Sequence, residues 1–207
     1  MTRATFIEMV LRNVYGEQPN DDSTITKGLV NTWIEPGIGL AVKQNYKDSI
    51  SFDGVSYINN SFYTQFKGLP ITKEEPFVYK MTLPQIPMGI GKNEGINILR
   101  FADGNGNLSD PAIPLSENQL GYSNRMRRIP NKMTYWPEGI FLYVNSTLQL
   151  NTYTGSVRMI SGGNPTDLNS ELNVPADYTP IILDYCIKNL MQERMRIKDI
   201  TNDGASN

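Results

Sequence analysis

The stretch that decides the fold is Pro180-Ile-Ile-Leu-Asp-Tyr-Cys-Ile-Lys-Asn-Leu190, near the end of the 207-residue chain. Its apolar residues recur at i, i+3, i+4 and i+7, and these are Leu183, Cys186, Ile187 and Leu190. This spacing is that of one face of an α-helix. Pro180 is tolerated in a first turn, and Asp177 or Thr179 is placed to cap it. The pattern predicts an amphipathic closing helix that needs partners from elsewhere in the chain.

The same spacing occurs at the beginning of the chain. The residues that carry it are Ile7, Val10, Leu11 and Val14. Thr5 and Glu8 have the spacing of a capping box, and Tyr15-Gly16 is expected to end the helix. We therefore predict an opening helix whose apolar face resembles that of the closing helix.

A third helical region is predicted over residues 22–47, where Asp21-Asp22-Ser23 forms the start signal. Its apolar positions repeat about every four residues and are Ile25, Leu29, Trp33, Ile38, Val42 and Tyr46. Pro36 removes one helical hydrogen bond, which allows one kinked helix or two abutting helices. The apolar face continues on both sides of Pro36, and this favours one kinked helix.

Between residues 50 and 171 the pattern changes to short β-rich runs separated by turn residues. The runs are Ile50–Phe52, Val55–Ile58, Phe77–Met81, Asn97–Phe101, Phe141–Val144, Thr147–Leu150 and Ser156–Ile160. Asp53-Gly54 is a typical hairpin turn between the first two runs. Asn60–Phe66 is ambiguous between a strand and a short helical turn. No long helix is expected between Gly68 and Asn169.

These elements predict an α+β fold in which helices from both chain ends form a small bundle, with a large antiparallel β domain inserted between them in the sequence. The expected domains are residues 1–49 with 172–200 for the bundle, 50–171 for the β insertion, and 201–207 for a flexible tail. The residues expected to pack the helices together are Ile7, Val10, Leu11, Val14, Leu29, Trp33, Leu183, Ile187 and Leu190. So small a bundle has little core, so neighbouring subunits are expected to cover its apolar faces.

Composition restricts the possible chemistry. The chain has no histidine and one cysteine, which excludes His-dependent triads, His/Cys zinc sites, iron–sulfur clusters and intrachain disulfides. Nineteen basic and 21 acidic residues give a net charge of −2, so no strong global attraction to DNA or membranes is expected. We predict no catalytic residues, no cofactor, no metal site and no membrane segment, in a protein made in the cytoplasm.

Two loops resemble ligand motifs without meeting their requirements. Gly89–Gly95 lacks the glycine spacing of phosphate-binding loops and has no helix after it. Asp103–Asn107 begins like a calcium loop, but Leu108 and Pro114 stand where glycine and glutamate are needed. Both are interpreted as turns, and Cys186 as a small core residue.

One charged segment stays open to several interpretations. Arg125, Arg127, Arg128 and Lys132 carry four positive charges with no acid between them, and Tyr135 and Trp136 follow. Basic residues beside aromatic ones can hold a phosphate backbone or single strands. A solvated loop, or a loop that pairs with acids of a neighbouring subunit, is favoured over nucleic-acid binding. The aromatic residues also suit a protein interface.

The order of the elements resembles the head-to-tail connector proteins of tailed bacteriophages, the adaptor rings beneath the portal. The resemblance lies in Thr5–Arg12, in Ile25–Tyr46 with its Trp33-Ile-Glu-Pro and Gly39-Leu-Ala-Val-Lys-Gln runs, and in Leu172–Met191. In the middle, Ser61–Pro70 and Tyr79–Pro84 are most similar to ring proteins of podoviruses of the crAss-like kind.

This resemblance implies a virion protein at the head–tail junction that joins portal to tail without catalysis. It implies a homo-oligomeric ring, commonly of twelve subunits, that contacts the portal and further tail or ring proteins. DNA would pass through the lumen without sequence-specific binding. Two alternatives stay open: a nucleic-acid-binding module that uses Arg125–Lys132, and a receptor- or carbohydrate-binding β protein suggested by Tyr135-Trp136-Pro137.

Overall fold

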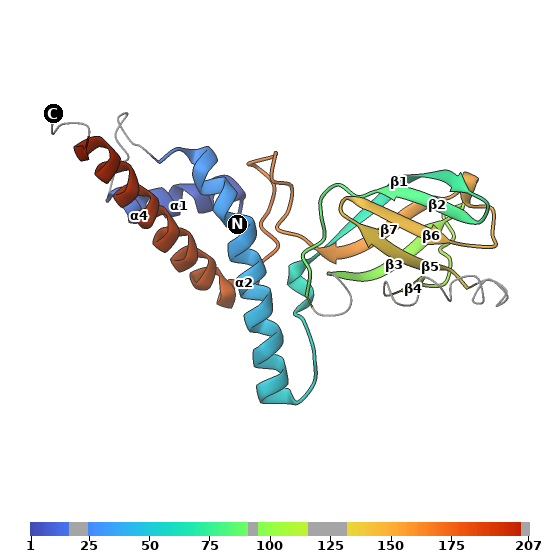
Figure 1. The fold of residues 1–207 in the computed structure, drawn as a ribbon. Coiled ribbons are helices and arrows are strands. Elements are labelled where there is room, and N and C mark those ends of the chain that lie inside the picture. Colours follow the sequence, from blue (N-terminus) through green and yellow to red (C-terminus); the bar gives the residue numbers. More distant parts are fainter. Residues whose placement is uncertain (17–24, 91–94, 116–131, 204–207) are drawn as a thin grey trace. The chain divides into compact units, whose positions relative to one another are not determined.

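The computed structural model describes residues 1–16, 25–90, 95–115 and 132–203, and the chain divides into two compact units. The helical unit comprises Met1–Phe62 and Gly162–Asn207, and the β unit comprises Tyr63–Ser161. Helices from both chain ends therefore enclose, in sequence, an inserted sheet (Figure 1). The predicted α+β fold class is confirmed.

The opening helix α1 spans Arg3–Tyr15 and ends at Gly16, as the sequence predicts. Its N-cap is Thr2, whose side-chain oxygen accepts a hydrogen bond from the Thr5 amide at 3.2 Å. The predicted capping box of Thr5 and Glu8 is therefore wrong, because Thr5 lies inside the first turn. The backbone amides of Arg3 and Ala4 donate to the carbonyls of Ser170 and Leu168, which joins the chain start to the segment before the closing helix.

The second helix, α2, is continuous from Lys27 to Asp53, with Pro36 inside it and Thr26 as its N-cap. It is one helix rather than two. The predicted start at Asp21–Ser23 lies outside the described residues. The predicted strands at Ile50–Phe52 and Val55–Ile58 and the hairpin turn at Asp53-Gly54 are wrong. Helix α2 runs on until Gly54 adopts the left-handed conformation that ends it, with φ +68°.

The closing helix α4 spans Thr179–Asp203 and follows a short 3₁₀ turn, η5, at Ala176–Tyr178. Neither predicted cap has the extended backbone of an N-cap, since Asp177 lies in η5 and Thr179 has helical angles. The fully buried face of α4 consists of Ile182, Cys186 and Leu190.

The β unit contains one seven-stranded sheet in the order β3-β7-β1-β2-β6-β5-β4. All neighbouring strands are antiparallel except β4 and β5, which are parallel. The strands are β1 (Tyr63–Glu75), β2 (Val78–Thr82), β3 (Ile96–Ala102), β4 (Ile113–Pro114), β5 (Thr134–Glu138), β6 (Phe141–Asn145) and β7 (Thr154–Ile160). Two further 3₁₀ turns are η1 (Asn60–Phe62) and η4 (Leu150–Thr152).

The long strand β1 connects the two halves of this sheet. Its first part, Tyr63–Pro70, pairs with β7, and its second part, Ile71–Glu75, pairs with β2. The register shifts between Phe66 and Leu69, where Gly68 has φ +71°. A shift of this kind bends a strand and lets the sheet curl over one core.

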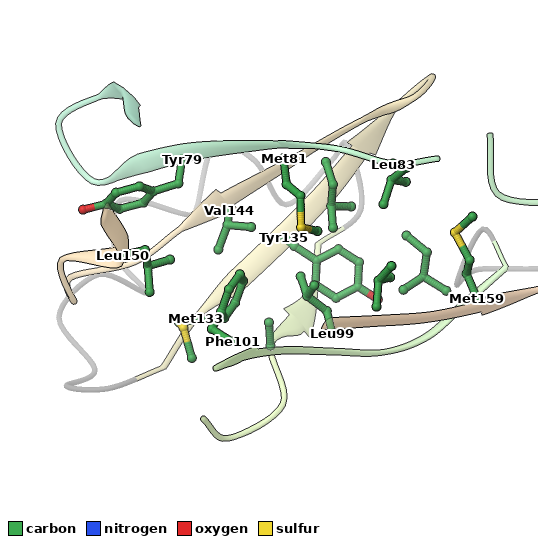
Figure 2. Packing of buried hydrophobic residues seen from close by; sticks show 14 residues of the cluster. Tyr79, Met81, Leu83, Leu99, Phe101, Met133, Tyr135, Val144, Leu150 and Met159 are labelled. Carbon is green, nitrogen blue, oxygen red and sulfur yellow. The ribbon is translucent and has the colours of Figure 1, made fainter. Parts of the chain in front are cut away.

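The core of the β unit draws large side chains from both halves of the sheet (Figure 2). Leu99, Phe101 and Met159 come from β3 and β7, whereas Tyr79 and Val144 come from β2 and β6. The run Thr147–Leu150, predicted as a strand, is irregular and leads into η4. Strand β5 was not predicted, because Pro137 interrupts its alternating pattern.

Candidate assembly surfaces

Helices α1, α2 and α4 pack against one another. All four of the residues singled out on α1 are buried, as is Leu190 on α4; Leu29, Trp33, Leu183 and Ile187 are half-buried. On α2 the predicted Ile38 and Val42 are buried, but before Pro36 the buried positions are Val30 and Ile34 instead of Leu29 and Trp33. The buried residues of α2 are Val30, Ile34, Gly37, Ile38, Ala41, Val42, Asn45 and Ser49. A Cβ on Gly37 would lie 2.9 Å from the Ile182 side chain, so close approach of α2 and α4 depends on this glycine.

Arg3, the first residue of α1, is a buried charge in the helical unit, with 0% of its side chain exposed. Its Nε donates to Asn31 Oδ1 at 2.9 Å, Nη1 donates to Glu35 Oε1 at 3.0 Å, and Nη2 contacts the same oxygen. Asn31 Nδ2 donates in turn to the Pro165 carbonyl. Burial raises the pKa of Glu35, and the nearby Arg3 charge partly offsets that rise. The network ties α1 and α2 to the segment before α4.

An apolar groove of about 520 Å³ lies between α1 and the beginning of α4. Its walls include Phe6, Met9, Leu172, Val174, Ile182 and Leu183. Of these, Phe6, Leu172 and Ile182 are buried, whereas Met9, Val174 and Leu183 are half-buried. A volume of this size falls in the range of pockets that enclose a ligand or several side chains.

A second apolar surface lies at the C-terminal end of α2. Four large exposed hydrophobic residues fall within residues 50–57: Ile50, Phe52, Val55 and Tyr57. We call this segment the α2 tip. Phe52 is 85% exposed, the most of any large hydrophobic residue described. Figure 1 shows the last turns of α2 extending beyond the first turn of α4.

Hydrogen bonds anchor the chain immediately before and after the α2 tip. Asn45 Nδ2 donates to the Tyr178 hydroxyl at 3.0 Å, and that hydroxyl donates to Asp48 Oδ2 at 3.2 Å. The Asn59 amide, beyond the tip, donates to Asn45 Oδ1 at 2.9 Å. The Phe62 and Tyr178 rings meet edge to face, with centroids 5.6 Å apart. The chain on either side of the tip is therefore anchored.

The predicted basic–aromatic segment is placed only in part. Arg125, Arg127 and Arg128 lie outside the described residues, and Lys132 is exposed. Tyr135 is 2% exposed and packs in the β core, so its ring is not a surface feature. Trp136 points the other way, where it stacks on Tyr143 with centroids 5.6 Å apart.

Trp136 belongs to an aromatic and basic row on the outer face of the sheet. The register places it opposite Tyr143, which lies opposite Lys80. The Lys80 ammonium lies 4.2 Å from the centre of the Phe141 ring and 3.2 Å from Glu74 Oε1. Sequence periodicity could not find this row, because it depends on the pairing of three strands.

A smaller polar pocket of about 190 Å³ lies on β1, β3 and β7. It is lined by Gln65, Ile98, Arg100, Leu108, Ser156 and Arg158. The Arg100 Nε is buried and has no hydrogen-bond partner among the described residues. Gln65 Nε2 donates to the Ser156 hydroxyl, and the Arg158 guanidinium lies over the Tyr63 ring. Two guanidinium groups at one pocket favour an oxyanion as its neighbour.

The rejected ligand motifs have structural roles where they are described. Asp103 accepts hydrogen bonds from the amides of Asn105 and Asn107 and from the Asn107 side chain, which lower its carboxyl pKa. This is a local turn. Residues 91–94 of the glycine-rich loop lie outside the described part. Burial raises the pKa of the Cys186 thiol to about 12, which keeps it protonated.

Neither a metal-binding cluster of acidic and cysteine side chains nor a helix long and apolar enough to cross a bilayer occurs among the described residues. A groove and a projecting tip, both apolar and both open, are surfaces typical of a subunit in a larger assembly. The chain matches the family of phage tail ring protein 2 over residues 5–207 and therefore belongs to it. This is a family of structural virion proteins of crAss-like phages. None of the curated proteins is detectably similar to the chain.

Proposed function

We propose that this protein assembles with copies of itself into a closed ring at the head–tail junction, where it joins the portal to the tail. Membership of a tail ring family over residues 5–207 is the observation that carries this proposal. The apolar groove and the α2 tip support it, because a lone subunit leaves both open to water. The resemblance to portal adaptors favours twelve copies and a lumen through which DNA passes without sequence-specific contacts.

We also propose that the helical unit supplies the contacts of the ring and that the β unit presents a second surface to other tail proteins. The outer row of Trp136, Tyr143 and Lys80 fits that second role, since aromatic side chains are enriched in protein interfaces. The charged segment Arg125–Lys132 is assigned to a protein neighbour rather than to DNA. A lumen that lets DNA slide tolerates few strong phosphate contacts.

Negative-stain microscopy tests the proposed location. The purified protein is imaged alone, with its portal, and with the other ring proteins of the same tail. We expect rings that stack coaxially on the portal or on an adjacent ring. Rings that stack only on a ring distant from the portal would remove the portal contact from the proposal.

A nucleic-acid-binding role is the second candidate, and it is favoured by the polar pocket that Arg100 and Arg158 line. Phosphate contacts make affinity fall steeply as salt rises, with a slope of about −0.9 per neutralised phosphate. Binding to duplex DNA at two salt concentrations therefore distinguishes the candidates. Affinity that is weak at both concentrations supports the structural role.

A further inference from the structure

We propose that the ring contact is made by insertion of the α2 tip of one subunit into the apolar groove of the next copy of this chain. This inference rests on the proposed homo-oligomeric ring and names the surfaces that close it. A cyclic ring needs a heterologous contact, in which two different surfaces of the same subunit meet. The groove and the tip are two such surfaces, and no residue of the tip lines the groove.

The two surfaces complement each other in chemistry. The groove is lined almost entirely by apolar side chains over about 520 Å³, and the tip offers two aromatic and two aliphatic side chains. Phe52 is 85% exposed in the single subunit, so it makes no use of its own groove. An exposed aromatic residue of this kind is suited to act as the anchor of an interface.

The tip is also preorganised for insertion. Helix α2 fixes its beginning, and the hydrogen bond from the Asn59 amide to Asn45 Oδ1 fixes its end. The Tyr178 hydroxyl links Asn45 to Asp48 beneath the tip. A segment that is already ordered loses little conformational entropy on binding. The position of Tyr178 in η5, beside the groove residues Ala176 and Thr179, connects the base of the tip to the wall of the groove.

The test uses three variants of the full-length protein, one that disables the tip and two that disable the groove. Phe52→Asp places a charge on the tip, and Leu183→Asp places one in the groove. Ala176→Trp serves as a second groove variant, because it fills the groove from an exposed position and leaves the helix core untouched. Met195→Asp is the matched control, since Met195 is 67% exposed on α4 and belongs to neither surface.

Light scattering and native mass spectrometry measure the assembly of each variant and of an equimolar mixture of the tip and groove variants. We expect rings from the wild type and from Met195→Asp, and monomers from each tip or groove variant. The dissociation constant for self-association should rise about 100-fold, as expected for the loss of an interface anchor. The mixture should form discrete dimers and no rings, because only one intact tip and one intact groove can meet.

If Phe52→Asp and Ala176→Trp form rings like those of the wild type, only this contact is overturned and the proposed ring is retained. Wild-type protein that stops at dimers would show a two-fold contact and contradict the head-to-tail arrangement. Loss of rings in Met195→Asp as well would contradict the assignment to these two surfaces. Wild-type protein that remains monomeric at every concentration contradicts the proposed ring itself, and this contact with it.

Discussion

The buried Arg3 gives the sharpest test of how the helical unit is held together. Replacing it by lysine keeps the charge but removes the planar fork that reaches Asn31 and Glu35 together. At least one charge-assisted hydrogen bond is lost, which costs about 1.5–3 kcal/mol. An ammonium group is also more strongly hydrated than a guanidinium group and is harder to bury. We expect Arg3→Lys to lower the free energy of unfolding of the helical unit by about 3 kcal/mol.

The two tryptophans allow each unit to be followed separately, because Trp33 lies in the helical unit and Trp136 in the β unit. In a Trp136→Phe background, urea unfolding monitored by fluorescence reports the helical unit alone. Arg12→Lys is the control, since Arg12 is exposed on the same helix, and it should change stability by less than about 0.5 kcal/mol. Protein concentration is held constant, because assembly raises apparent stability.

The reasoning is refuted if Arg3→Lys shifts the unfolding free energy no more than Arg12→Lys does. In that case the hydrogen bonds of Arg3 would contribute no more than those of a solvated side chain. An equal loss in the β unit, followed by Trp136 in a Trp33→Phe background, would also contradict the assignment of this network to the helical unit alone.

Three further predictions concern Glu35, Cys186 and the basic segment. Burial holds the pKa of Glu35 above its ordinary value, so between that value and the raised pKa the folded state binds more protons than the unfolded state. The stability of the helical unit should therefore fall as pH rises through this window, and the fall should be absent in Glu35→Gln; identical pH profiles would contradict it. The Cys186 thiol, with a pKa of about 12, should resist a thiol-specific reagent at pH 8 until denaturant is added, and rapid reaction of the folded protein would show that it is accessible. Serine at Arg125, Arg127, Arg128 and Lys132 should abolish assembly with the portal or other tail proteins and leave DNA affinity unchanged. Intact assembly with these proteins, together with loss of a salt-dependent DNA affinity, would favour the nucleic-acid-binding role.

Apolar periodicity predicted α1 and α4 well because each is an amphipathic helix. It misplaced the buried face of α2 by one position before Pro36, whereas Ile38 and Val42 beyond it are buried as predicted. Next to Pro36, it is Gly37 and not a large residue that lies close against Ile182 of α4. Periodicity gives weight to large side chains such as Trp33, and a small residue that permits close approach carries no such signal. The end of α2 was missed because Ile50 and Phe52 alternate like a strand, although the helix continues to Gly54.

The assembly surfaces depend on residues that meet only in the folded chain. The groove combines Phe6 with Leu183, and the Arg3 network joins α1 to Glu35 of α2. No local pattern indicates that Arg3 is buried, since a basic residue in a first turn is normally exposed. The outward position of Trp136 and the inward position of Tyr135 follow from the strand register, which the sequence does not reveal.

Native mass spectrometry of the purified wild-type protein, over a range of concentrations, tests the central claim most directly. A closed ring predicts one dominant species with a fixed number of subunits, and that number should not change as concentration rises. Monomers at all concentrations, or an open series of oligomers that grows without limit, would contradict a ring that this chain closes by itself.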